Sequence, residues 1–448
     1  MKTRHLVALV DCSAFYCSCE RAFRPDLKHK PIVVLSNNDG CVISRDRQAK
    51  SLGVPMGAPY FKVRRDLERK GIVVFSSNYA LYADLSRRVM ATLERFTPDV
   101  DIHSIDEAFL TLRASVLEDG QPAPGERERL EADAREIRLE VERAIGIGVR
   151  VSIAETRTLA KAASEYARDH GGTVCFWGHP DRDAFLRSMP VGDVWGIGPR
   201  WSARLEAENV KTAAAFASLS EERLRPYTVV GTRTAWELRG VPCHTPGAGP
   251  TPRRSLVRSR SFGRRTPELG VALEAVANHA ARAAEKLRAE GLAAGALQVF
   301  VTTGGSRHGD GPHRHGTLMT GFVHPTSSTA TIVRTARRLL QSCHRPTNAR
   351  GVPYRYMKAG VILTELSLQS ACQADLFVPK AAEKTELWEA LDRINRQFGR
   401  HTVALASQGS PSARVEMDAG RGGPAWAMRR EMMSPRYTVS WDDLPTAA

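Results

Sequence analysis

The sequence predicts an α+β protein of several domains, and three features of the chain support this. The first 190 residues predict strands and helices in the order β, α, β-hairpin, α, β, which is typical of a ferredoxin-like sheet with helices on one face. After Pro190 the pattern changes to short helices. A segment rich in proline and glycine, residues 241–252, then separates these helices from a second α+β region.

Hydrophobic periodicity places the elements before Pro190. Residues 6–10 form an apolar run that predicts a central strand. The tetrapeptide Asn37-Asn38-Asp39-Gly40 predicts a hairpin between two short strands. We expect the remaining strands at residues 31–35, 41–44, 72–76, 100–112 and 148–153, and helices at 14–23, 45–52, 60–69, 79–96, 126–144 and from 156 onward.

The region after the linker begins with a basic strand, residues 252–265. In it, Arg258 and Arg260 alternate with other residues, so they lie on one face at a spacing that suits a phosphate backbone. Helices at 267–290 and 327–342 and strands at 297–302, 317–321 and 356–363 complete this region. Residues 304–315 form a loop rich in glycine and histidine, to which we assign no function.

The charge of the chain points to its partner. A formal net charge of +15 favours a polyanion, and nucleic acid before a membrane surface. The apolar run at residues 6–10 is too short for a secretion signal, and no run is long enough to span a bilayer, so we expect a cytoplasmic protein associated with the nucleoid. The eight cysteines are spread along the chain, which favours reduced, buried thiols over disulfides or a zinc site.

Three carboxylates stand where strands end. Asp11 follows the apolar run directly, and Asp106 and Glu107 interrupt a second apolar, β-branched run. Neighbours in a regular strand point to opposite faces, so Asp106 and Glu107 converge only if the chain bends at residues 104–107. Oxygen ligands of this kind suit Mg²⁺. The alternatives are an exposed hairpin tip for Asp106 and Glu107, and a helix N-cap for Asp11.

Five segments carry motifs that can be compared with known families: residues 11–16, 19–20, 30–41, 76–79 and 104–109. In content and order, these motifs resemble those of the Y-family translesion DNA polymerases, and most of all their UmuC-type members. The resemblance implies a palm with fingers at residues 1–188 (fingers about 25–78), a helix-hairpin-helix thumb at 189–240, a linker at 241–252 and a little-finger DNA-binding domain at 253–370. Residues 371–448 would hold a clamp-binding motif and a UmuC-type tail whose role we do not assign.

The resemblance implies an error-prone DNA polymerase that acts in translesion synthesis and the SOS response to DNA damage. Two Mg²⁺ ions would be held by Asp11, Asp106, Glu107 and the Cys12 carbonyl. Phe15 and Tyr16 would contact the incoming nucleotide, with Tyr16 as the steric gate against a ribose 2′-hydroxyl. Arg47, Lys50 and Lys161 would bind the triphosphate, although Arg47 stands where many members carry Tyr. Each of these basic residues is also compatible with an ordinary solvated surface charge.

Two further sites concern macromolecular partners. Gly196 and Gly198 flank one apolar residue in the predicted thumb, where bare backbone N–H groups can approach a DNA phosphate. Gln373, Leu376 and Phe377 resemble a sliding-clamp-binding peptide, with two apolar anchors and one hydrogen-bonding side chain. By resemblance the chain would also join a UmuD-like accessory dimer and RecA.

Two rival functions stay open at this point. A catalytically silent scaffold for DNA and clamp binding could have the same fold, although intact Asp11, Asp106 and Glu107 argue against it. A two-metal nuclease would use the same carboxylates. Tyr16, Lys50 and Lys161 favour a nucleotide substrate.

Overall fold

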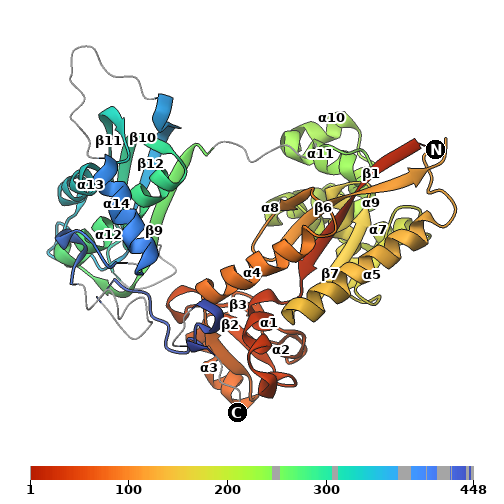
Figure 1. The fold of residues 1–448 in the computed structure, drawn as a ribbon, viewed down its shortest axis with the longest axis horizontal. Coiled ribbons are helices and arrows are strands. Elements are labelled where there is room, and N and C mark those ends of the chain that lie inside the picture. The colour runs from red at the N-terminus through yellow and green to blue at the C-terminus, as the bar shows by residue number, and fades with distance from the viewer. Residues whose placement is uncertain are drawn as a thin grey trace. The chain divides into compact units, whose positions relative to one another are not determined.

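The computed structural model describes residues 2–244, 253–304, 311–371, 385–399, 401–410, 424, 426–439 and 443–444 (Figure 1). The chain divides into two compact units, which are described separately below. Unit 1 comprises Met1–Val34, Val42–Gly249 and Ser434–Ala448, and unit 2 comprises Leu35–Cys41 and Pro250–Met433. None of the helices in the described part combines the length and apolar character needed to cross a membrane.

The main sheet of unit 1 has five strands in the order β5-β6-β1-β7-β8. The central strand β1 (Lys2–Cys12) is antiparallel to β6 (Glu107–Val116) on one side and to β7 (Val149–Ala154) on the other. Strand β5 (Val100–Ile102) pairs with β6, and β8 (Thr173–Cys175) runs parallel to β7. The predicted central position of the first strand is therefore confirmed.

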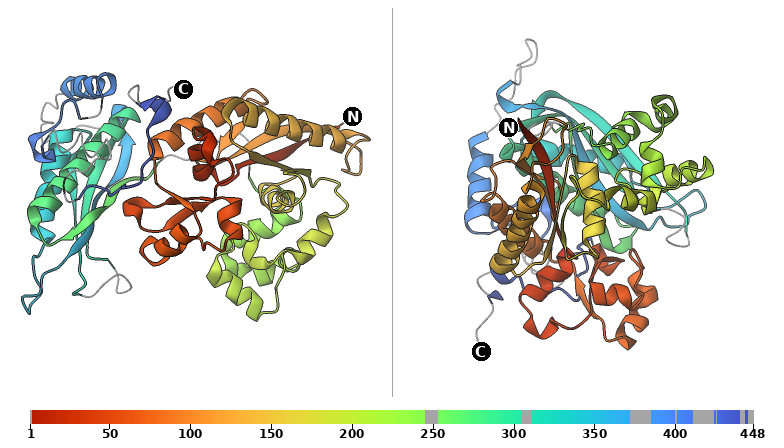
Figure 2. Two further views of the ribbon diagram at one scale, coloured as in Figure 1. Left: turned by 90° about the horizontal axis from the view of Figure 1, so that it is seen from below. Right: turned by 90° about the vertical axis from the view of Figure 1, so that its right-hand side faces the viewer.

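Helices cover both faces of this sheet, so the predicted arrangement with helices on one face is wrong. Leu6, Ala8 and Val10 of β1 pack on one face with α1 (Phe15–Ala22), α4 (Tyr79–Leu93) and α5 (Glu126–Ile145). Leu9 points the other way and packs with α6 (Arg157–Ala167). Figure 2 shows the long α5 and the helix α6 on opposite sides of the strands. The reason is that every residue from Ala8 to Val10 is apolar and buried, which requires a partner layer on each side.

A smaller sheet of three strands, in the order β3-β2-β4, precedes α4. Its strands are β2 (Ile32–Leu35), β3 (Val42–Arg45) and β4 (Val73–Ser76), with the helices α2 (Arg47–Ser51) and α3 (Tyr60–Arg69) between β3 and β4. The turn predicted between β2 and β3 is present as a 3-10 turn, Asn37–Asp39. Asn38 and Asp39 both have positive φ angles, 60° and 50°, which asparagine and aspartate tolerate better than most residues.

A group of short helices completes unit 1. These are α7 (Arg182–Ser188), α8 (Pro199–Ala207), α9 (Ala213–Ala217), α10 (Glu221–Leu224) and α11 (Thr228–Leu238). Phe216, Leu224 and Tyr227 are fully buried among them and share one core with α6 and Leu9. This core joins the short helices to the face of the main sheet that carries α6.

The sheet of unit 2 has four strands in the order β11-β10-β12-β9. They are β9 (Ser255–Thr266), β10 (Leu292–Thr302), β11 (His315–Thr326) and β12 (Tyr356–Leu368), all antiparallel to their neighbours. Helices α12 (Leu269–Ala289) and α13 (Thr329–Cys343) cover one face of the sheet. Most buried residues of α12 are alanines, so this helix can approach the sheet and α13 closely.

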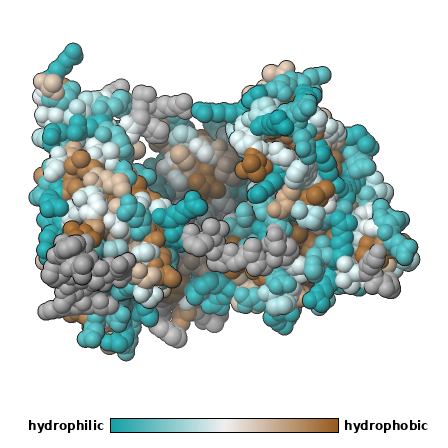
Figure 3. All heavy atoms as spheres, turned by 90° about the horizontal axis from the view of Figure 1, so that it is seen from above, coloured by the Kyte–Doolittle hydropathy of each residue, from teal (hydrophilic) through white to brown (hydrophobic). Residues whose placement is uncertain are grey.

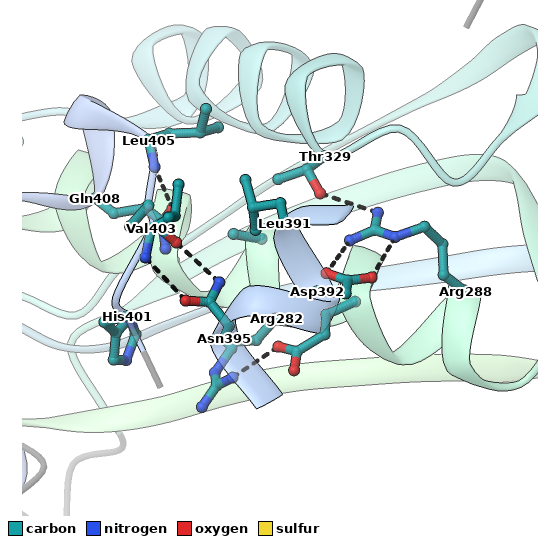
Figure 4. A pocket seen from close by; sticks show the side chains of 13 residues that line it. Arg282, Arg288, Thr329, Leu391, Asp392, Asn395, His401, Val403, Leu405 and Gln408 are labelled. Carbon is teal, nitrogen blue, oxygen red and sulfur yellow. Dashed lines mark hydrogen bonds and ion pairs between the residues drawn. The ribbon is translucent and has the colours of Figure 1, made fainter. Parts of the chain in front are cut away.

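Helix α14 (Thr385–Gln397) is attached to unit 2 through Arg288 of α12 (Figure 4). The Arg288 guanidinium donates to both carboxylate oxygens of Asp392, at 2.7 and 2.8 Å. It also donates to the Ser327 carbonyl at 2.6 Å and to the Thr329 hydroxyl at 3.0 Å. The side chain of Arg288 is only 5% exposed, so its charge is compensated by these partners rather than by water.

Candidate active site

Two of the predicted acids face each other across the main sheet. In the register of β1 and β6, Asp11 is directly opposite Glu107, so their side chains share one face. That face is the one that carries Leu9 and α6.

The third acid lies at the predicted bend. Asp106 immediately precedes β6, and its carbonyl accepts a hydrogen bond from the Cys12 N–H at 2.9 Å. The backbone N–H groups of His103 and Ser104 both donate to the Glu107 carbonyl, at 3.0 and 3.1 Å. This arrangement confirms the bend between β5 and β6.

Each acid has a polar partner within the chain. Arg150 is opposite Asp11 in β7, and its guanidinium forms an ion pair with the Asp11 carboxylate. The Lys161 ammonium of α6 lies 2.9 and 2.8 Å from the two oxygens of Glu107. The Asp106 carboxylate accepts a hydrogen bond from the Ser104 hydroxyl. These partners offset the cost of placing carboxylates in a partly buried position.

The three carboxylates lie close enough together for the charges of Asp106 and Glu107 to act on the pKa of Asp11. Burial raises the pKa of Asp11 above its ordinary value, and the negative charges of Glu107 and Asp106 raise it further, while Arg150 acts to lower it. Burial also raises the pKa of the Cys12 thiol, with added contributions from all three acids. A cation that bound here would relieve this mutual repulsion.

The donor set at this sheet edge fits a hard divalent cation, because it consists of carboxylate oxygens and the backbone carbonyls beside them. In the described part of the chain, no three His, Cys, Asp or Glu side chains are gathered closely enough to form a metal cluster. Arg150 and Lys161 occupy the carboxylates of Asp11 and Glu107 instead. Metal binding by these residues therefore stays a prediction.

Tyr16 belongs to a group of aromatic side chains on α1 and α4. Its ring stacks on Tyr82 with centroids 4.5 Å apart and contacts Tyr79 edge-on at 6.1 Å. Phe15 is buried beside it, with centroids 5.9 Å apart. Ala14 has a positive φ of 45° and lies in the sharp turn between β1 and α1. Because this turn is short, Phe15 and Tyr16 follow Asp11 closely in the sequence.

The basic residues predicted for the triphosphate occupy different elements. Arg47 and Lys50 are exposed on α2, while Arg45 belongs to β3 and donates to the Val54 carbonyl. Lys161 lies on α6 beside the acids. The structure thus places Lys161 beside the acids. Arg47 and Lys50 lie on α2, the helix that follows β3 of the three-stranded sheet.

Sequence reasoning missed two residues at the acids, Arg150 and Trp195. The Trp195 ring lies 5.1 Å from the Lys161 ammonium and 5.4 Å from the His103 ring. A signal for Arg150 was available, because this residue interrupts the buried strand residues 149–153 with a charge. Trp195 carried no such signal, since its place beside Lys161 depends on the packing of the short helices.

The residues predicted to contact DNA lie in both units. Gly196 has a φ of 92° that only glycine adopts easily, and Gly198 precedes α8, with open space where a Cβ would lie. The element before this turn is a 3-10 turn, Val191–Asp193, rather than a full helix. The predicted contact of these glycines with phosphate is still open.

Arg258 and Arg260 share a face of β9, as predicted. The same face carries Leu256 and Phe262, which pack in the core with α12. Burial lowers the pKa of His279 of α12 to about 3, and the charges of Arg260 and Arg258 contribute to this shift. The open face of β9 carries Val257, Ser259 and Ser261 instead. The predicted clamp-binding residues Gln373, Leu376 and Phe377 lie outside the described residues.

The fold is that of the Y-family DNA polymerases. A solved structure described as "Y-family DNA polymerase chimera Dbh-Dpo4(243-245)-Dbh" matches with a TM-score of 0.61 at 19% identity, and the match covers 81% of this chain and 99% of that one. The main sheet with its acids thus corresponds to a palm, accompanied by fingers, a thumb and a little finger.

The sequence comparisons are more specific. Residues 10–165 match the impB/mucB/samB family, residues 253–376 match the C-terminal domain of that family, and residues 385–447 match a domain of unknown function, DUF4113. Protein UmuC of Salmonella typhimurium is 40% identical over 98% of this chain and 99% of its own length. Protein MucB of Escherichia coli is 35% identical over 99% of both, and DNA polymerase IV of Brucella melitensis is 27% identical over 89% of this chain and 84% of its own. The chain therefore belongs to the impB/mucB/samB family of Y-family DNA polymerases, as a UmuC-type DNA-directed DNA polymerase.

Proposed function

We propose that the protein extends primers across damaged template positions by two-metal nucleotidyl transfer, as part of the SOS response to DNA damage. The observation that carries the proposal is the register of β1 and β6, which sets Asp11 opposite Glu107 at the edge where Asp106 enters the strand. The substrates are a primed template and deoxynucleoside triphosphates. The net charge of +15 suits such polyanions, and hydrophilic residues cover much of the face drawn in Figure 3.

In this proposal, Asp11, Asp106 and Glu107, together with the Cys12 carbonyl, would hold two divalent ions, which we expect to be Mg²⁺. When bound there, they would supply positive charge that favours deprotonation of the 3′-hydroxyl and stabilises the leaving pyrophosphate. The chain's own cations prepare the site: Arg150 and Lys161 keep Asp11 and Glu107 compensated, and must give up part of these contacts when the site is loaded. Lys161 can then interact with the triphosphate.

The nucleotide pocket is assigned to the aromatic group and the exposed cations. Tyr16, held against Tyr82, would exclude a ribose 2′-hydroxyl, and the buried Phe15 would support it. Arg47 and Lys50 would bind phosphate oxygens as exposed cations. On the DNA side, Gly196, Gly198, Arg258 and Arg260 would contact the backbone.

The partners proposed beyond DNA rest on the resemblance. They are a sliding clamp bound through Gln373, Leu376 and Phe377, a UmuD-like accessory dimer and RecA. A cytoplasmic location at the nucleoid follows from these partners.

The test is a primer-extension assay with primed template, Mg²⁺ and labelled deoxynucleotides. Wild type should extend the primer, and Asp106→Ala should abolish extension while DNA affinity stays nearly unchanged. The exposed acid Asp119 provides a matched control, since it follows the end of β6 that is opposite to the Glu107 end, and Asp119→Ala should extend normally. Degradation of the primer would indicate a nuclease, and neither extension nor degradation would indicate a silent scaffold. The ion pairs that occupy Asp11 and Glu107 are the observation that favours this last alternative.

A further inference from the structure

Residues 434–439 belong to unit 1, although the chain before them, up to Met433, belongs to unit 2. They end in a 3-10 turn, Tyr437–Val439, that packs against α4 (Figure 2). Ser434 is 5% exposed and Tyr437 is 6% exposed, which is unusual for polar residues near a chain end. This segment, called the C-terminal strap below, is therefore built into unit 1.

Asn78 anchors the first half of the strap. Its side-chain amide donates to the Ser434 carbonyl at 3.3 Å, the Ser434 hydroxyl at 3.0 Å and the Pro435 carbonyl at 3.0 Å. The same side chain caps α4 by accepting from the Leu81 N–H. Asn78 is 2% exposed, so these contacts are made away from water.

The second half of the strap is fixed by a stack and a hydrogen bond. The Tyr437 ring stacks on Phe23, just beyond α1, with centroids 4.5 Å apart and planes 10° from parallel. The Thr438 hydroxyl donates to Asp84 of α4 at 2.8 Å. The strap thus connects the end of α1 to the first half of α4.

The strap reaches the aromatic group of the proposed nucleotide pocket through α4. Asn78, which binds Ser434, caps the helix that carries Tyr82. Tyr82 stacks on Tyr16 with centroids 4.5 Å apart, and its hydroxyl donates to the fully buried Glu20 of α1 at 2.6 Å. Burial raises the pKa of Glu20 to about 7, whereas the hydroxyls of Tyr82 and Ser434 act to lower it. The strap, Asn78, Tyr82 and Tyr16 therefore form a connected series of contacts.

We propose that the C-terminal strap is a positioning element for sugar selection, which fixes the start of α4 and with it Tyr82 and the ring of Tyr16. The inference rests on the proposed function, because it takes Tyr16 as the residue that excludes a ribose. A steric gate works only if its ring cannot retreat when a 2′-hydroxyl presses on it. Tyr82 stacks on that ring, and the strap is hydrogen-bonded to Asn78, which caps the helix α4 that carries Tyr82.

The test measures the ratio of kcat/KM for a deoxynucleotide to that for the matching ribonucleotide, with full-length protein. Ser434→Ala removes the buried hydroxyl that accepts from the Asn78 amide, and we expect the ratio to fall about fivefold to tenfold, the size expected for one buried polar contact. Tyr437→Ala should have a similar effect, and Tyr437→Phe should restore the wild-type ratio because it keeps the stack on Phe23. Ser188→Ala is the control: it removes an exposed serine hydroxyl of α7 that donates to the Phe185 carbonyl, outside the strap, and the ratio should stay within about twofold.

The ratio separates positioning from general damage, because partial unfolding lowers both rates together and leaves the ratio unchanged. An unchanged ratio in both Ser434→Ala and Tyr437→Ala, with a lowered ratio in Tyr16→Ala, overturns the strap's role and leaves the gate intact. An unchanged ratio in Tyr16→Ala overturns the gate and this inference with it. Hydrogen exchange gives a second readout: amides at residues 79–82 should lose protection in Ser434→Ala, and full protection there would also contradict the proposal.

Discussion

The Lys161 ammonium bridges both carboxylate oxygens of Glu107, at 2.9 and 2.8 Å, and so ties α6 to the edge of the palm sheet where the proposed chemistry takes place. The same ammonium lies 5.1 Å from the Trp195 ring. Both side chains of the ion pair are mostly buried, with 16% and 23% of their surface exposed, so the contact is stronger than a typical surface pair. One cation is thereby held between an acid of the main sheet and the ring of Trp195, which precedes α8.

Replacing this cation should impair catalysis more than binding. Lys161→Ala is expected to lower kcat/KM for deoxynucleotides about 100-fold, the size of loss typical when one charge is removed from the developing phosphate charge. DNA affinity should be unchanged. Single-nucleotide incorporation under pre-steady-state conditions measures the effect, with Lys70→Ala, a surface lysine paired with Asp66, as the control. Equal kinetics for Lys161→Ala and wild type would remove Lys161 from the mechanism.

Glu20 should make the protein less stable as the pH rises. Its carboxyl keeps its proton up to about pH 7 in the folded state but loses it near 4.5 when unfolded, so the unfolded state binds fewer protons between these values. The free energy of unfolding therefore falls across this window, by roughly 2.5 × 1.36 ≈ 3 kcal/mol at most.

Glu20→Gln keeps an acceptor for Tyr82 and removes the titration. Its Tm should equal that of wild type near pH 4.5 and exceed it above pH 7, which thermal unfolding at a series of pH values would measure. Parallel curves for the two proteins would show that Glu20 does not titrate in this window.

Much of the palm could be predicted from the sequence because its signals are local. Asp11 follows an apolar run, and Asp106 and Glu107 break another, which was enough to predict that the two strands bring these acids to one edge. Helix α3 was predicted with the bounds that it has, since its apolar spacing and its start at Tyr60 after Pro59 are local features as well.

The errors and omissions concern long-range packing. The placement of α6 on the second face of the sheet depends on Leu9 and Phe109 facing away from Val10 and Ala108, and an apolar run does not show which helix covers which side. The docking of Ser434 on Asn78 joins residues from opposite ends of the chain, through polar atoms without any periodicity. No local pattern encodes such a contact.

The attachment of α14 to the little finger should depend on Arg288. Arg288→Ala leaves Asp392 without its bidentate partner, and we expect a loss of about 3 kcal/mol in the free energy of unfolding of this unit. Arg282→Ala is the matched control on the same helix, because Arg282 pairs with Glu285 within α12, at a more exposed position, and should cost less than about 0.5 kcal/mol. Urea unfolding followed by tryptophan fluorescence suits this test, since Trp388 of α14 lies 6.0 Å from the Arg288 guanidinium. Similar losses in the free energy of unfolding for both variants would show that the Arg288–Asp392 ion pair has no special role in attaching α14.

Arg150 should weaken metal binding at the proposed site. Its guanidinium pairs with Asp11, one of the carboxylates that would hold the ions, so a divalent cation has to compete with it. In Arg150→Met this competition is gone, and the apparent Kd for Mn²⁺, measured by electron paramagnetic resonance on the protein without nucleotide, should fall about tenfold at pH 8.

A second effect of Arg150→Met reduces the gain in Mn²⁺ affinity at lower pH. Arg150 also lowers the pKa of Asp11, so its removal raises that pKa further above the ordinary value, and protons then compete with the metal. The gain in Mn²⁺ affinity of Arg150→Met should therefore shrink as the pH falls. Lys70→Met, a change of the same charge at the protein surface, should leave Mn²⁺ binding unchanged at both pH values. Weaker Mn²⁺ binding by Arg150→Met at pH 8 would mean that Arg150 supports Asp11 as a ligand rather than competing for it.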